Sequence, residues 1–299
     1  MGYIFAILSY ALYATVNYVD KFVLEKYKIN PVVLTIYTGI SALIATCIIL
    51  LFTGFHSIDF STGSIIVISG ILTQLYLIPY FKALRLDEAS RVIPLFQLSP
   101  IVVLFLGFLF LGEIFSFKQY IGAALIIGAS LLLTIEKLDL KIIKLRPALY
   151  YAMLSCTLYG FAIFLFKIGL TQDISFWIAL PYEGLGIVIG SVCILFYKNN
   201  FSQFIKITKI MNKKIFIYTS FNDLVFIASR YTQYFALTLL SASIVSLLGG
   251  FQPIFALLYG LLLSLWFPKI IKEIISPKNI SIKIAAILIV CIGLYLLFI

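Results

Sequence analysis

Residues 85–113 read RLDEASRVIPLFQLSPIVVLFLGFLFLGE, and the pattern of this stretch returns later in the chain. Shifting residues 83–107 by 153 positions places them on residues 236–260, and 11 of the 25 aligned positions are then identical. Pro100 aligns with Pro253, each in the middle of a long apolar run. A proline at such a place removes a backbone hydrogen bond and clashes with the preceding turn. The repeat therefore predicts two interrupted helices, one in each half of the chain.

The composition is that of a membrane protein. Of the 299 residues, 63% are hydrophobic and 11% are charged, whereas a soluble domain is about 45–50% apolar and about 25% charged. Apolar runs of roughly 20 residues recur along the chain, and each is long enough to cross the hydrocarbon layer as a helix. We therefore predict an all-α integral membrane protein.

Ten apolar runs are predicted to span the membrane, with short connectors that leave no room for a soluble domain. They lie at about 3–23, 32–54, 62–84, 89–111, 118–136, 148–170, 174–197, 215–237, 241–267 and 281–299.

A second repeat divides these spans into two groups of five. At an offset of 146, residues 6–21 fall on residues 152–167, with Tyr13 on Tyr159 and Lys21 on Lys167. The predicted units are residues 1–146 and residues 147–299. Because five is an odd number, the second unit would cross the membrane in the opposite sense, as in the inverted repeats of alternating-access carriers.

The basic residues predict the orientation. Connectors 1–2, 3–4, 5–6, 7–8 and 9–10, with their flanks, hold 18 of the 22 Lys and Arg residues, and the opposite side has only Lys118. This bias places the connectors that carry these residues in the cytosol and both termini on the opposite, extracytoplasmic side. The predicted location is the cell (inner) membrane. The net charge of +10 comes from basic residues in the connectors, where membrane topology accounts for them. We therefore expect a lipid bilayer as partner and no nucleic acid.

Over nearly its whole length the chain resembles the EamA-type drug/metabolite transporter superfamily. The first half carries Ala89-Ser90-Arg91, Pro100, Leu111-Gly112-Glu113 and the glycines Gly122 and Gly128. The second half departs from the pattern, because Ser264-Leu265-Trp266 replaces Leu-Gly-Glu and Glu273 is the candidate to stand in for Glu113. The family arginine of the second helix is absent, with Tyr37-Thr38 in its place. The resemblance implies a ten-helix solute carrier with a central cavity between its halves.

Three ionisable residues lie deep inside predicted spans: Glu183, Asp223 and Arg230. A charge at this depth costs about 2.5–3.5 kcal/mol on insertion scales and commonly marks a solute pathway. Asp223 and Arg230 are two turns apart on one helix face. We expect the three to line the cavity and hold the opposite charges of a zwitterion. The alternative is a structural pair that joins Arg230 to Glu183 or Asp223.

Other predicted substrate-binding residues have polar groups on the same or neighbouring spans. They are Tyr231, Tyr234, Gln74, Tyr80, Tyr13, Asn17, Tyr159 and Gln252. Aromatic rings with polar tips suit an organic solute. Tyrosines can instead be interfacial anchors, and Gln252, next to Pro253, can instead satisfy the interrupted backbone.

Two further features have structural interpretations. Lys21 and Lys167 lie near span ends and are expected to extend to the membrane interface. Gly186 and Gly190 have the small-residue spacing that brings helices close together, and we expect packing within the bundle.

The leading functional hypothesis is a secondary transporter for a small organic metabolite, such as an amino acid or similar zwitterion, working by alternating access as a monomer or homodimer. A flippase for a lipid-linked sugar and, less favoured, a membrane enzyme that modifies lipid are the alternatives. No catalytic residue, cofactor or metal site is predicted, because the chain has one histidine, scattered acids and no paired cysteines.

Overall fold

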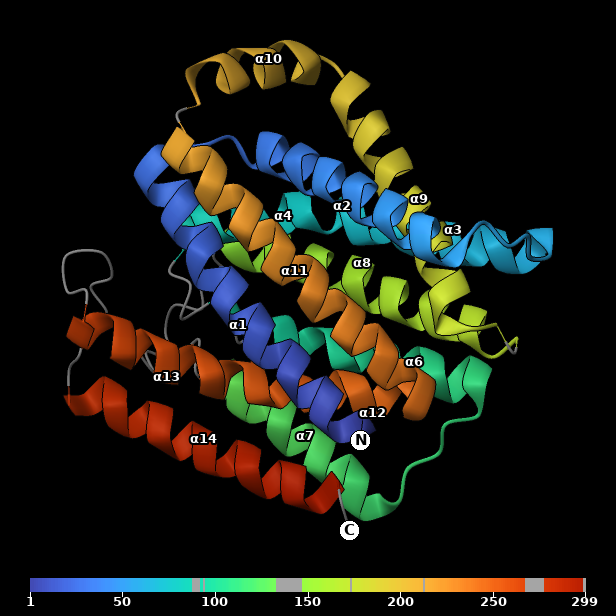
Figure 1. Cartoon of the computed structure of the whole chain (residues 1–299). Coiled ribbons are helices and arrows are strands. Elements are labelled where there is room, and N and C mark those ends of the chain that lie inside the picture. Colours follow the sequence, from blue (N-terminus) through green and yellow to red (C-terminus); the bar gives the residue numbers. More distant parts are fainter. Residues whose placement is uncertain are drawn as a thin grey trace.

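The computed structural model describes residues 1–87, 92–93, 95–132, 147–172, 174–211, 213–266 and 277–297, and the described part is built from helices (Figure 1). The helices are α1 (Gly2–Tyr27), α2 (Pro31–Thr53), α3 (Phe60–Leu75), α4 (Leu77–Leu86), α6 (Ser99–Leu111), α7 (Phe117–Leu132), α8 (Pro147–Leu170), α9 (Phe176–Phe196), α10 (Asn200–Ile210), α11 (Lys213–Leu239), α12 (Ala242–Leu247), α13 (Phe251–Trp266) and α14 (Pro277–Leu297), with 3-10 turns η1 (Phe96–Leu98) and η2 (Leu248–Gly250). The Ala89-Ser90-Arg91 motif, Glu273 and the predicted boundary at residue 146 lie outside the described residues.

Six segments of the described chain are long and apolar enough to cross a membrane. They are Gly2–Tyr27, Pro31–Thr53, Phe60–Leu86, Pro147–Leu170, Phe176–Phe196 and Ala242–Gly260. Three more predicted spans correspond to shorter apolar helices, at Ser99–Leu111, Phe117–Ala129 and Leu288–Leu297. The remaining one, 215–237, falls on the more polar helix α11. The chain is a multi-pass, all-helical membrane protein.

Two predicted segments differ from the structure. The span 62–84 is two helices, α3 and α4, which meet at Tyr76. The connector after α9 contains a further helix, α10, that hydropathy alone did not reveal because it is short and alternates apolar with polar residues.

Helices of the first half pack extensively against helices of the second half. Helix α1 lies along α11 and α13, and α8 lies against α3, α4 and α6 (Figure 1). The first helix of each half therefore packs mainly against helices of the other half.

The prolines begin helices rather than sit within them. Pro100 is in the first turn of α6, directly after η1, and Pro253 is in the first turn of α13, directly after η2. Proline is tolerated in a first turn because its missing N–H has no helical partner there. The interrupted helices predicted from the repeat are present, with each break just before its proline.

Side chains of the central helices satisfy the carbonyl groups near these breaks. Tyr10 of α1 donates to the Val245 carbonyl at 3.0 Å, and Tyr18 donates to the Ala256 carbonyl at 2.8 Å. In α8, Cys156 donates to the Leu95 carbonyl at 3.3 Å. A bilayer offers no water to these groups, so internal partners are required.

Lys21 and Lys167 donate to helix ends. The Lys21 ammonium lies 2.6 Å from the Leu84 carbonyl at the end of α4, and it also donates to the Asp87 carbonyl at 2.7 Å. The Lys167 ammonium lies 2.6 Å from the Leu237 carbonyl at the end of α11. Each lysine therefore binds the negative end of a helix dipole, while its extension to the membrane interface stays a prediction.

The Leu-Gly-Glu sequence has a structural role. Gly112 ends α6 with a left-handed φ of 63°, a conformation that glycine adopts without strain. The next residue, Glu113, then accepts hydrogen bonds from the backbone N–H groups of Ala242 at 2.9 Å and Ser243 at 3.1 Å. A carboxylate is favourable at this helix N-terminus, so Glu113 ties the end of α6 to the start of α12.

Asp59 is a second acid that caps the start of a helix, at the N-terminus of α3 and outside the membrane-spanning part of that helix. Asp59 accepts a hydrogen bond from the Thr62 N–H at 2.8 Å, and this bond lowers the pKa of the Asp59 carboxyl.

Helices α3 and α9 approach so closely that glycine is needed at their crossing. A Cβ atom at Gly186 would overlap the Val67 carbonyl oxygen, and one at Gly190 would lie 3.0 Å from Gln74 Cβ. The Gly186 and Gly190 spacing thus serves packing within the bundle, as predicted.

We predict that Gly186→Ala lowers the free energy of unfolding by about 1–3 kcal/mol, the usual range for overpacking, because its methyl group meets backbone that cannot rotate away. Thermal denaturation of the purified protein measures the loss. Gly128→Ala is the matched control, since no atom lies within 4 Å of its added Cβ. Equal melting temperatures for the two variants would contradict the close crossing.

Candidate functional site

A cavity lies between the central helices of the two halves. It is lined by Tyr13, Val16, Asn17 and Asp20 of α1, Thr38 of α2, Tyr76, Leu77, Tyr80 and Phe81 around α4, Phe96, Tyr159 of α8, Asn222, Asp223 and Phe226 of α11, and Gln252 of α13. A smaller adjoining hollow shares Asp20 and Asp223 and continues past Tyr37 toward the start of α2 and of α11. Both halves of the chain therefore contribute to one site.

Asp20 is a buried carboxylate on the cavity wall, with 6% of its surface exposed. The Asn222 amide nitrogen donates to Asp20 Oδ1 at 2.6 Å. The Tyr80 hydroxyl lies 3.0 Å from Asp20 Oδ2 and 2.6 Å from Asn17 Oδ1, with one proton to donate between them. Asp20 is thus held by neutral donors.

Asp223 lies beside it, with 8% of its surface exposed. Thr38 Oγ1 donates to Asp223 Oδ1 at 3.0 Å, and Ser41 Oγ donates to Oδ2 at 2.8 Å. In the part of the chain that the structure describes, no Lys or Arg forms an ion pair with Asp20 or Asp223. Two carboxylates therefore line one cavity without a basic partner from these residues.

Aromatic rings form the rest of the wall. Tyr76 and Tyr159 have ring centroids 4.9 Å apart, and Tyr80 meets Phe96 edge to face at 5.3 Å. Tyr13 lies between Tyr159 and Phe226, at 6.5 and 6.0 Å. The faces of such rings attract cations.

Tyr13 and Tyr159, which align in the repeat, share one acceptor. Their hydroxyl groups donate to Gln233 Oε1 at 3.3 Å and 2.8 Å, while the Gln233 amide nitrogen donates to the Tyr10 hydroxyl at 3.0 Å. Gln233 of α11 therefore joins α1 and α8 through two tyrosines, Tyr13 and Tyr159, that line the cavity.

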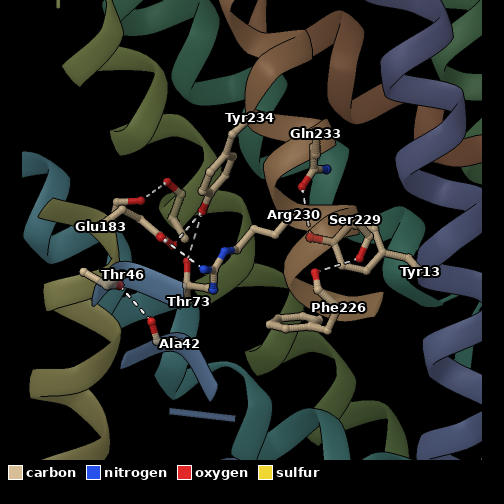
Figure 2. Close-up of polar contacts among 12 residues, drawn as sticks. Tyr13, Ala42, Thr46, Thr73, Glu183, Phe226, Ser229, Arg230, Gln233 and Tyr234 are labelled. Atoms are coloured by element: carbon tan, nitrogen blue, oxygen red, sulfur yellow. Dashed lines mark hydrogen bonds and ion pairs between the residues drawn. The ribbon is translucent and has the colours of Figure 1, made fainter. Parts of the chain in front are cut away.

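Arg230 and Glu183 form a separate buried charge pair, shown in Figure 2. Arg230 Nη2 lies 3.4 Å from Glu183 Oε2, and the two residues are 1% and 0% exposed. The Tyr234 hydroxyl donates to Glu183 Oε1 at 3.2 Å and lies 3.3 Å from Thr73 Oγ1. This pair links α9 to α11 outside the cavity lining, and the centroid of the Phe226 ring, which does line the cavity, is 5.7 Å from Arg230 Cζ.

The predicted site residues thus divide into two groups. Asp223, Tyr80, Tyr13, Asn17, Tyr159 and Gln252 line the cavity. Glu183, Arg230, Tyr231, Tyr234 and Gln74 do not line it. Of this second group, Gln74 donates to the Thr35 carbonyl and to Ser191, and Tyr231 has its ring 5.3 Å from Arg230 Cζ. Arg230 matches the alternative of a structural pair, with Glu183 as its partner.

Asp20, Asn222 and Thr38 were absent from the predicted site. Asp20 is next to Lys21 in the sequence, but the Lys21 ammonium points to the end of α4 and to Glu25, 2.9 Å away. The available signal was spacing, because Asn17 and Asp20 are three residues apart and so share one helix face with Tyr13.

We predict that Arg230→Gln destabilises the protein by about 3–5 kcal/mol, because it leaves the Glu183 carboxylate buried without its cation. Adding Glu183→Gln should restore most of the lost stability, whereas adding Asp223→Asn should not, since Asp223 is bound by Thr38 and Ser41. Thermal denaturation compares the three variants. Equal rescue by Asp223→Asn would make Asp223 the partner of Arg230.

Comparison with known proteins agrees with this architecture. A sequence model of the EamA-like transporter family matches residues 1–135. A Sinorhizobium sp. protein described as an uncharacterized transporter in the cobO 3′ region is 39% identical over 74 residues, which are 25% of this chain and 52% of that protein. The chain thus spans about half the length of that relative.

An uncharacterized Methanocaldococcus jannaschii protein is 32% identical over 134 residues, 44% of this chain and 96% of that protein. One solved crystal structure has the same fold, with a TM-score of 0.62 at 17% identity, covering 99% of this chain and 96% of the other. From these matches, the chain belongs to the EamA-like transporter family.

Proposed function

We propose that this protein is a secondary transporter for a small organic metabolite that carries a cationic amino group, such as an amino acid or a similar zwitterion. The observation that carries the proposal is the pair Asp20 and Asp223, two buried carboxylates on one aromatic cavity, each held by neutral donors. Family membership supports transport as the activity.

The charge balance of the cavity favours a cationic group in the solute. A buried charge without a partner is costly, and an opposite charge within a few ångströms offsets the cost. An ammonium group would meet both carboxylates and could also lie against the faces of Tyr76 or Phe226. Arg230 pairs with Glu183 and does not line the cavity, so the amino group is the part of a zwitterion that this cavity favours.

We further propose that transport occurs by alternating access between two inverted five-helix repeats, residues 1–146 and 147–299, with ten membrane crossings. Three matched features support the repeat. Lys21 and Lys167 each bind the end of the third predicted span of their own half, at α4 and α11. Tyr13 and Tyr159 donate to one glutamine. A 3-10 turn precedes each aligned proline.

The same proposal places the protein in the cell or inner membrane with both termini outside. The bias of basic residues supports this orientation. In that orientation the hollow past Tyr37 leads toward the cytosol, because it approaches the starts of α2 and α11.

The test measures thermal stabilisation of the purified protein by three matched sets of compounds: amino acids, the same compounds without the carboxylate, and the same compounds without the amino group. We predict that the first two sets stabilise and the third does not. A ligand at 100 times its Kd adds about 2.7 kcal/mol. Asp20→Asn and Asp223→Asn should each weaken binding at least about tenfold, which is about 1.4 kcal/mol.

Asp59→Asn is the control for these variants. It also removes one carboxylate, but Asn can cap α3 as Asp59 does, and Asp59 lies outside the cavity. The proposal is contradicted if compounds without an amino group stabilise the protein equally well, or if the two cavity variants bind as tightly as Asp59→Asn does.

A further inference from the structure

Helix α10 connects α9 to α11 at the edge of the bundle (Figure 1). Its inner face packs against the first turns of α2. The Phe204 and Tyr37 rings are 5.3 Å apart, the Tyr37 hydroxyl and Thr208 Oγ1 form a 2.7 Å hydrogen bond, and the Asn30 amide nitrogen donates to Gln203 Oε1 at 2.7 Å. These contacts fix which side of α10 faces outward.

The outward side carries an apolar stripe that ends in a lysine. Phe201, Ile205 and Lys209 follow each other at intervals of four residues, so they share one face. Phe201 and Ile205 are 47% and 37% exposed, although both are apolar. Phe201 also stacks on the exposed ring of Phe196 at the end of α9, with centroids 5.9 Å apart. Because α9 crosses the membrane and ends here, this stripe lies at the level where the bilayer meets water.

The charged residues in and around α10 are all lysines. Lys198, Lys206, Lys209, Lys213 and Lys214 fall within 17 residues, and no acidic residue occurs between Glu183 and Asp223. Lys206 and Lys209 are exposed, and the Lys198 ammonium lies 4.9 Å from the Tyr197 ring centroid. Exposed aromatic and aliphatic side chains bordered by lysines are the pattern of a helix that lies in the membrane interface.

We propose that α10 is an interfacial helix whose outer face binds the headgroups of anionic phospholipids. Each lysine near an anionic membrane surface adds electrostatic attraction, while Phe201 and Ile205 enter the boundary of the acyl chains. The bound lipid would also lie close to the cavity entrance, because Tyr37 contacts α10 and lines the hollow beside Asp20 and Asp223.

The experiment uses the full-length protein in a neutral detergent and adds phosphatidylglycerol or phosphatidylcholine of the same acyl chains. We expect phosphatidylglycerol to raise the melting temperature more, and native mass spectrometry to show more of it retained. The double variant Lys206→Gln with Lys209→Gln keeps helix propensity and should lose at least half of the difference between the two lipids. Lys118→Gln, an exposed lysine at the start of α7, is the control and should keep it.

Three results would overturn the proposal. Phosphatidylcholine could stabilise the protein as much as phosphatidylglycerol does. The double variant could keep the full difference while melting normally without lipid. Inorganic phosphate at equal concentration could reproduce the shift, which would assign it to a free anion in place of a lipid surface. None of these results depends on the identity of the transported solute.

Discussion

A bilayer provides no hydrogen-bond partner for peptide groups, and this constraint determines how the protein tolerates its broken helices. Side chains of α1 and α8 donate hydrogen bonds to carbonyl groups close to these breaks: Tyr10 and Tyr18 to Val245 and Ala256, and Cys156 to Leu95. The two helices are therefore held against the opposite half of the chain. That position brings the middle of α1 and of α8, with Tyr13, Asp20 and Tyr159, to the wall of one central cavity.

The buried charges fall into two arrangements with different physical consequences. Glu183 and Arg230 form an ion pair at 3.4 Å and do not line the cavity, so their contribution is to hold α9 against α11. Among the described residues, Asp20 and Asp223 have hydroxyl and amide donors only, and they face the cavity. Hydroxyl and amide dipoles stabilise a carboxylate but leave its net charge, so this second arrangement can respond to a cation or a proton that enters the cavity.

Much of this organisation could be predicted from the sequence, because it is encoded by local rules. Apolar runs predict membrane helices, and an aligned proline predicts a break near the same depth in both halves. The partners of the buried charges could not be predicted in this way. Asp223 and Arg230 share a helix face, yet α2 supplies Thr38 and Ser41 to one and α9 supplies Glu183 to the other. Helix α10 was also missed, since a short helix at the interface has neither the length nor the hydropathy of a span.

In the proposed alternating-access cycle, one cavity is reached in turn from each side of the membrane, and side-specific labelling measures this access. Gln252→Cys, on the cavity wall, would be introduced with Cys156 replaced by Ser, which keeps a donor for the Leu95 carbonyl, and the other three cysteines replaced by Ala. A membrane-impermeant maleimide would be applied to each face of oriented vesicles, with Asn199→Cys as the marker of the cytosolic face. Alternating access predicts labelling of position 252 from both faces and of position 199 from the cytosolic face alone. Labelling of position 252 from a single face, or from neither, would contradict it.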